Sequence, residues 1–427
     1  MSAKLKSDKE LRAALKTFFT SVESDVATSE TKLHEAIFRP GGRIVGQVAF
    51  IESDATRLAR EKVLKRAQRV MGPVASDEKE IDDLIWRMAA RRTVTPAKTV
   101  EDAEAEVIAQ LGKNLEEPQV YIAKNDGVTF SDDLNDLTIG PVRAVRTAVL
   151  EVELQTAHPN KRWEEFISRE PGASPTGYGA PDLVWAVALT GSVKNIQEQA
   201  RWLVDIAMSL IRLGYLRQPG AFSDLGDPET CPMGVAESRR AGVAISERGM
   251  PEFFRPDRQV SLNAAAGKVL MSAPFTDYAA VFTAKEGSVA ERVAQGLGWM
   301  TRGRQSADRA ERLLYFFTAV EALLTNSDKT APVTQTIARH ASVILADTPQ
   351  DRVKIAGQFK SLYGLRSALV HSGKRGVGRS DADTVQALVE ALYDRVLALV
   401  PLSSDAQNLN LALDKASYGG AWSPVEP

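Results

Sequence analysis

The chain has 427 residues, which is too long for one ordinary hydrophobic core and predicts two or three domains. Its 53 Lys and Arg residues nearly balance 55 Asp and Glu residues, so a nucleic-acid-binding surface would have to be a local patch. The single cysteine, Cys231, excludes a disulfide framework and a Cys-rich zinc site, and no apolar run reaches the ~18 residues of a membrane span. These features predict a cytoplasmic protein without membrane contact.

Residues 1–117 are predicted to form a helical region. Leu11, Leu15 and Phe18 recur at helical spacing, and charged residues fill the positions between them, as on a solvated helix face. No motif of known chemistry occurs in this region. The simplest interpretation is a helical module for packing or oligomerisation.

The next region, 118–216, is predicted to be a small mixed α/β region. Asn125-Asp126-Gly127 separates two short apolar runs at 120–122 and 128–130, which predicts a β-hairpin. Apolar and polar residues alternate over 150–154, which indicates a half-buried strand.

Two longer patterns complete this region. The continuous apolar run at 183–189 predicts a strand that is covered on both faces. Residues 196–213 return to helical spacing, so a helix is expected there.

Residues 217–258 are rich in Pro and Gly and are interpreted as a connecting segment. Residues 259–403 have helical periodicity again and predict a helical bundle, whereas the tail at 404–427 has too little apolar content to form a core of its own. The expected helices of the bundle lie near 287–302, 306–325, 332–346, 350–371 and 381–400. The predicted fold class is mainly α with a smaller α/β region.

Familiar catalytic motifs are incomplete in this chain. Gly296 and Gly298 begin a glycine-rich dinucleotide motif, but Thr301 stands at its third glycine and a helix, not a strand, is expected before it. The four histidines have no cysteine near them in sequence and no metal-ligand spacing. We therefore expect no metal and no cofactor.

The chemistry is concentrated near the end of the expected helix at 350–371. Arg366 offers a planar, permanently charged fork for phosphate oxygens, and His371 supplies an imidazole, the kind of side chain that can move a proton in acid–base catalysis. Lys374, Arg375 and Arg379 follow without an acidic residue between them, and they are expected to hold an RNA backbone.

The spacing of Arg366 and His371 sets a geometric condition. Positions five apart on a regular helix point about 140° away from each other. The two side chains converge only if the helix ends or distorts before His371, or if a second subunit completes the site. Taken alone, the pattern also fits a helix-terminal histidine whose partners are backbone carbonyls, beside a solvated basic loop.

Three blocks in this part of the chain resemble the Apea-like HEPN family. They are the expected helix block at 311–324, which carries Glu311 and Glu321, the next helix block at 337–345 with Arg339, and residues 362–373 with the order Tyr-x-x-Arg-Ser and then His-x-Gly. The resemblance covers roughly 290–400. It implies a helical bundle of four or five helices that commonly dimerises, and in many members a metal-independent endoribonuclease.

Carried over to this chain, the resemblance implies catalytic roles for Arg366 and His371. Ser367 would be the polar residue that follows the arginine, and Glu321 and Tyr363 would be supporting residues that orient the site or close the core. Ser372 stands where many relatives have glycine.

The hypothesis from the sequence is therefore a metal-independent HEPN endoribonuclease, an RNA-cleaving effector in antiviral or toxin-type defence. The expected partners are RNA, a second copy of the chain through the bundle, and a phage-derived trigger or regulatory protein that the N-terminal region senses. Two alternatives stay open: a non-catalytic HEPN module that binds RNA or protein, and a scaffold whose activity lies in 118–216.

Overall fold

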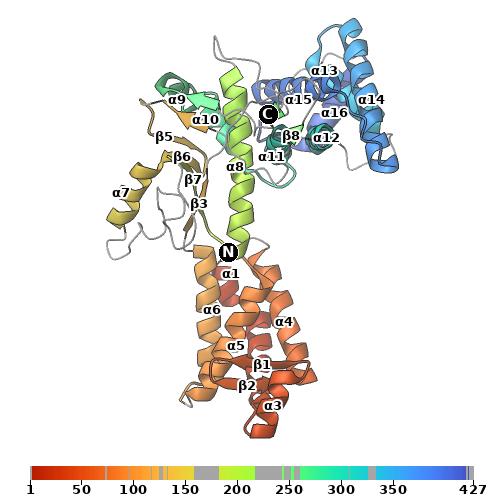
Figure 1. The fold of residues 1–427 in the computed structure, drawn as a ribbon. Coiled ribbons are helices and arrows are strands. Elements are labelled where there is room, and N and C mark those ends of the chain that lie inside the picture. Colours follow the sequence, from red (N-terminus) through yellow and green to blue (C-terminus); the bar gives the residue numbers. More distant parts are fainter. Residues whose placement is uncertain are drawn as a thin grey trace. The chain divides into compact units, whose positions relative to one another are not determined.

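The computed structural model shows a mainly helical chain with a smaller α/β part, as the sequence predicts (Figure 1). It describes residues 2–422 except 73–74, 96, 117, 125–127, 132, 158–181, 217–242, 245–251, 254–259, 307, 326–332 and 420–421. The chain divides into two compact units. Unit 1 contains residues 1–121 and 188–201, and unit 2 contains residues 122–187 and 202–427.

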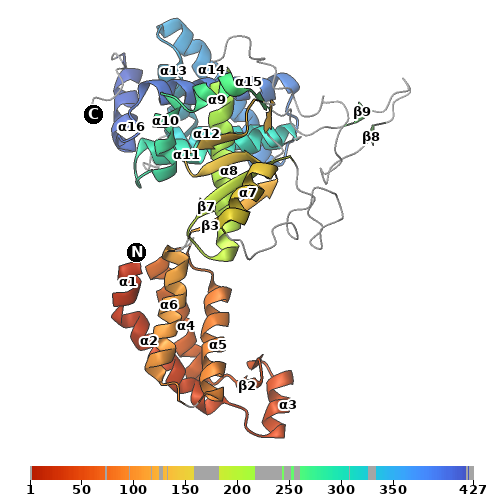
Figure 2. The ribbon, with the colours of Figure 1, turned by 90° about the vertical axis from the view of Figure 1, so that its left-hand side faces the viewer.

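Unit 1 is a cluster of helices around one hydrophobic core. Helix α2 packs against α4 and α6, and α5 packs against both α4 and α6, so these four helices run side by side (Figures 1 and 2). Phe18, Phe50 and Trp86 are buried in the core, and the centroid of the Trp86 ring lies 5.4 Å from that of Phe18 and 5.1 Å from that of Phe50. The helices are α1 (Ser2–Ser7), α2 (Lys9–Ser21), the 3₁₀ turn η1 (Val22–Asp25), α3 (Glu30–Phe38), α4 (Asp54–Met71), α5 (Glu78–Val94) and α6 (Val100–Glu116).

Unit 1 also contains a β-hairpin, so the prediction of an all-helical region was incomplete. Strands β1 (Gly42–Val45) and β2 (Val48–Ile51) pair in antiparallel register. Gly46 supplies the positive φ, 59°, that the two-residue turn between them requires. Four-residue strands contain too few alternations for sequence periodicity to detect.

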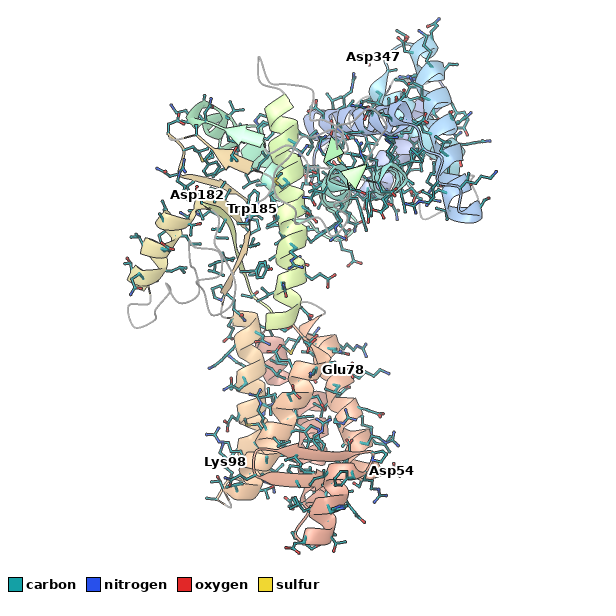
Figure 3. The ribbon with its side chains drawn as sticks, viewed as in Figure 1. Asp54, Glu78, Lys98, Asp182, Trp185 and Asp347 are labelled. Carbon is teal, nitrogen blue, oxygen red and sulfur yellow. The ribbon has the colours of Figure 1, made fainter. Side chains whose placement is uncertain are left out.

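A four-stranded sheet has the order β3-β7-β6-β5 and includes two of the predicted strands, those at 120–122 and 183–189. Its members are β3 (Gln119–Lys124), β5 (Asp136–Ile139), β6 (Val142–Arg146) and β7 (Leu183–Leu189). The run at 183–189 is a central strand, as predicted, and its Trp185, labelled in Figure 3, is buried. Helix α8 (Val193–Leu216) confirms the helical pattern that follows it.

Two predictions for this region were wrong. Strand β4 (Val128–Phe130) does not form a hairpin with β3, because it pairs in parallel with β10 (Val260–Leu262) in a different sheet. The turn residues expected at 125–127 lie outside the described residues.

Residues 150–154 form part of a helix, α7 (Thr147–Ala157), instead of the expected strand. Leu150 is buried and Leu154 packs against the same small core, whereas Val152 is 67% exposed. Leu150 and Leu154 are four residues apart, so their spacing fits one face of a helix as well as one face of a strand.

The C-terminal part of unit 2 is the predicted helical bundle. Helix α12 packs against α11, α13, α14 and α15. Each expected helix begins and ends within a few residues of its predicted bounds, and no strand occurs in the described residues of 306–371. The helices are α11 (Val289–Gln305), α12 (Arg309–Leu324), α13 (Val333–Leu345), α14 (Pro349–Ser372) and α15 (Arg379–Leu399).

Shorter elements complete unit 2. Helix α16 (Ala406–Ser417) lies in the segment expected as a tail, and its Leu409 and Leu413 are buried where it packs against α13. Most of the segment at 217–258 lies outside the described residues. The remaining elements are β8 (Val243–Ala244), β9 (Glu252–Phe253), α9 (Ala264–Leu270), α10 (Phe275–Tyr278) and the 3₁₀ turn η4 (Ala279–Thr283).

Candidate active site

Helix α14 carries the candidate catalytic residues and is continuous past both of them. Thr348 caps its start, with its hydroxyl oxygen accepting a hydrogen bond from the N–H of Asp351, and Pro349 occupies the first turn. The helix ends only at Gly373, whose left-handed φ of 65° lets its N–H donate to the carbonyl of Leu369 at 3.1 Å.

Arg366 and His371 therefore do not meet within one chain. On this regular helix their side chains point about 140° apart. Arg366 is half-buried and faces α12, whereas His371 is exposed and has no hydrogen-bond or ion-pair partner among the described residues. Because the helix neither ends nor distorts before His371, an Arg366 and a His371 side chain can meet only if they come from two different subunits.

The structure does bring Arg366, Glu321 and Tyr363 together. Nη2 of Arg366 lies 3.1 Å from Oε1 of Glu321, and the hydroxyl of Tyr363 donates to the same oxygen at 3.0 Å. The Arg366 guanidinium also lies over the Tyr363 ring, 5.4 Å from its centroid. The side chains of Arg366 and Glu321 are only 20% and 23% exposed, so the ion pair is weakly screened by solvent.

Tyr363 anchors this cluster to the core. Its ring packs edge-on against buried Phe317 of α12, with 5.3 Å between the centroids. Burial, the negative charge of Glu321 and the hydrogen bond to it together raise the pKa of Tyr363 above its usual value. Tyr363 is therefore a neutral hydrogen-bond donor at physiological pH. Ser367, next to Arg366, is half-buried, and its hydroxyl has no hydrogen bond within the described part of the chain.

The basic loop, as we call residues 374–379 after α14, forms an ion pair with the start of α12. Arg375 pairs with Asp308, whose other carboxylate oxygen caps α12 by accepting from the N–H groups of Ala310 and Glu311. Partial burial opposes ionisation of Asp308, but the N–H of Glu311 and the Arg375 guanidinium outweigh it and lower the pKa of the carboxyl.

The other two basic residues of the loop differ in their partners. Nε of Arg379 lies 3.7 Å from Oδ2 of Asp383, one turn further along α15. Lys374 is exposed, and its ammonium group has no partner among the described residues. Most of the loop's positive charge is thus already balanced by carboxylates.

Sequence reasoning missed Asp308 as a partner of the basic loop. Its position before an apolar helical stripe identifies it as a capping residue. The ion pair to Arg375, 67 residues away, depends on the path of the loop and leaves no local signal.

Comparisons of this chain with protein-family models, with curated proteins and with solved structures found no match. Within the described ranges, no three His, Cys, Asp or Glu side chains cluster as metal ligands would. The described helices also include none with the length and apolar content to cross a membrane.

Proposed function

We propose that this chain is a metal-independent endoribonuclease of the HEPN type, with Arg366 and His371 in its active centre. The observation that carries the proposal is the cluster of Arg366, Tyr363 and Glu321. Three residues that the resemblance singles out, from two helices, meet at the surface of the predicted bundle. A half-buried guanidinium held on one side by a carboxylate is a preorganised group for stabilising phosphate charge.

The chemistry requires little from the protein because RNA carries its own nucleophile. The 2′-oxygen attacks the adjacent phosphorus, a 2′-O–P bond forms, and the P–O5′ bond breaks. His371 exchanges protons with the 2′-hydroxyl and the leaving 5′-oxygen. Arg366 stabilises the negative charge that develops on the non-bridging oxygens. The products are a 2′,3′-cyclic phosphate and a 5′-hydroxyl.

A second copy of the chain is part of this proposal. Because α14 is regular through Ser372, Arg366 of one copy needs His371 of another to complete the acid–base pair. The end of α14 offers an apolar surface for that contact, since Val370 is 48% exposed and Leu365 and Leu369 are only half-buried. Facing copies would place two arginines and two histidines around one cleft.

The biological role follows from the proposed chemistry. An RNA-cleaving effector in antiviral or toxin-type defence must be restrained until a trigger arrives, and unit 1 is our candidate for the sensing or regulating part. The single cysteine of the chain fits the reducing cytoplasm.

A second candidate function is a non-catalytic module that binds RNA or protein. The ion pair to Glu321 favours it, because a neutralised guanidinium can serve packing alone. A gel assay with total RNA separates the two. Wild type should degrade RNA and His371→Ala should not, while His34→Ala, at another exposed histidine on α3, should keep full activity. Intact RNA with both wild type and His34→Ala would favour the binding module.

A further inference from the structure

The candidate active site offers little free positive charge for an RNA backbone. Of the three loop residues expected to bind RNA, Arg375 and Arg379 are paired with Asp308 and Asp383. Affinity for RNA rises with the number of phosphates that a protein neutralises. A ribonuclease with this site therefore needs another basic surface to hold its substrate.

Helix α4 of unit 1 carries such a surplus of charge. Its acidic residues are Asp54, at the start of the helix and labelled in Figure 3, and Glu61. Its six basic residues are Arg57, Arg60, Lys62, Lys65, Arg66 and Arg69.

The three arginines Arg57, Arg60 and Arg66 have structural partners. Arg60 lies 2.7 Å from Glu52, and Arg66 lies 2.6 Å from Asp8. Arg57 pairs with Asp54 within its own helix at 3.0 Å. Arg60 and Arg66 thus join α4 to other parts of unit 1, whereas Arg57 is paired within its own helix, so the charge of each is already balanced by a carboxylate.

The remaining basic residues, Lys62, Lys65 and Arg69, form what we call the basic stripe. All three are exposed, and none has a hydrogen bond or ion pair in the portion of the chain that the structure describes. On a regular helix they fall within an arc of about 60° and span about 10 Å along the axis. The opposite face of α4, with Val63 and Ala67, is buried in the core.

We propose that the basic stripe of α4 binds the phosphate backbone of single-stranded RNA; this choice of ligand rests on the proposed function. Three unpaired cations in a row match a chain of phosphates, and the flexible ammonium groups of lysine contact them without reading sequence. A protein partner would need an apolar centre to its interface, but Leu58 is the single exposed large hydrophobic residue among those described on α4.

The test is RNA binding by the full-length chain. Fluorescence anisotropy would measure the affinity for a labelled single-stranded RNA in the His371→Ala background, over a range of salt concentrations. The triple variant K62Q/K65Q/R69Q removes the stripe. K32Q/K79Q/K113Q is the matched control, because it removes three exposed lysines scattered over α3, α5 and α6.

The stripe variant should bind at least ~10-fold more weakly, and its log–log salt slope should fall by about 2, since each lost contact to a single strand removes ~0.7. The control variant should bind like the parent. In the catalytically intact chain, the stripe substitutions should raise KM for RNA and leave kcat unchanged. Circular dichroism should show the same helical content for all of these variants.

Equal RNA affinity for stripe and control variants would overturn the inference. So would a stripe variant that loses binding to polyglutamate but not to RNA, which would indicate an acidic protein partner. If the chain binds RNA through the stripe but cleaves none, the proposed function fails and the RNA-binding surface stands.

Discussion

Glu321 of α12 holds Arg366 of α14, with 3.1 Å between Oε1 and Nη2. The pair joins two helices that are 45 residues apart in sequence at that point and fixes one edge of the guanidinium. In the proposed mechanism the rest of the guanidinium stabilises the phosphate charge. This relationship makes Glu321 a positioning residue in the proposed mechanism.

Substitutions of Glu321 should therefore show how much the activity depends on the position in which Glu321 holds the Arg366 guanidinium. Glu321→Ala leaves Arg366 and the Tyr363 hydroxyl without their shared acceptor and should reduce kcat by ~10–100-fold, with a loss of about 1–3 kcal/mol in stability. Glu321→Gln keeps an acceptor oxygen and should recover part of both. Cleavage kinetics and denaturant unfolding measure the two effects. Full activity in Glu321→Ala would remove Glu321 from the site.

The proposed two-copy site can be tested by complementation. Arg366→Ala and His371→Ala chains should each be inactive, but an equal mixture, unfolded and refolded together, should regain about a quarter of wild-type activity. Half of the dimers are then mixed, and each mixed dimer has one intact Arg366–His371 pair across the interface. Light scattering should show a dimer at micromolar concentration. A mixture that stays inactive would place both residues of a functional pair in one chain.

The close packing around Gly296 of α11 predicts that a larger residue at this position lowers the stability of the protein. A Cβ atom there would lie 1.5 Å from the buried Tyr393 hydroxyl, which donates to the carbonyl of Ala319 at 2.7 Å. Gly296→Ala should destabilise the protein by about 1–3 kcal/mol. Gly357→Ala on α14 is the control, because its Cβ meets no atom within 4 Å, and it should be neutral or slightly stabilising. Thermal unfolding that ranks the two variants in the opposite order would contradict this packing.

The surroundings of Asp205 on α8 predict how the stability of the protein depends on pH. Its carboxylate lies 3.1 Å from Arg302, which rests over the Trp202 ring. Burial raises the pKa of Asp205 to about 6, and the attraction of Arg302 offsets only part of that effect. Since the folded state then binds the proton more tightly than the unfolded state, Asp205 disfavours folding increasingly as pH rises from about 4 to 6.

Asp205→Asn removes this titration. The variant should gain about 2 kcal/mol of stability relative to wild type between pH 4.5 and pH 7, provided the amide keeps the contact to Arg302. Denaturant unfolding at the two pH values measures the difference. Parallel pH profiles of wild type and variant would show that Asp205 does not titrate in this range.

The parts of the fold that periodicity could predict are those with long, one-sided apolar stripes. Helices α11, α12, α13 and α15 match their expected bounds because each buries an apolar stripe that runs along most of its length. Helix α14 buries only Phe359 and Leu362, so its bounds depend more on its end signals. The start of α14 carries a signal that is local in sequence, since Thr348 caps the helix and Pro349 occupies its first turn. In contrast, the alternation that misassigned α7 was too short to distinguish strand from helix.

The site was predictable to a similar extent. The resemblance in sequence proposes Arg366, His371, Tyr363 and Glu321 as site residues, and the structure adds that Arg366, Tyr363 and Glu321 are in contact. Whether Arg366 and His371 converge depends on the exact end of α14, which the sequence left open and which Gly373 sets beyond both residues. The pairing of Arg375 with Asp308 is a tertiary contact and has no counterpart in local sequence.

The central claim, metal-independent cleavage of RNA by Arg366 and His371, is tested most directly by incubating the full-length protein with labelled RNA in excess EDTA. Wild type should cut RNA but not the matching DNA, which lacks the 2′-hydroxyl, and should leave 2′,3′-cyclic phosphate ends. Arg366→Ala and His371→Ala should each slow cleavage by at least ~100-fold with unchanged circular dichroism. Cleavage that requires added Mg²⁺, or that persists in His371→Ala, would contradict the mechanism.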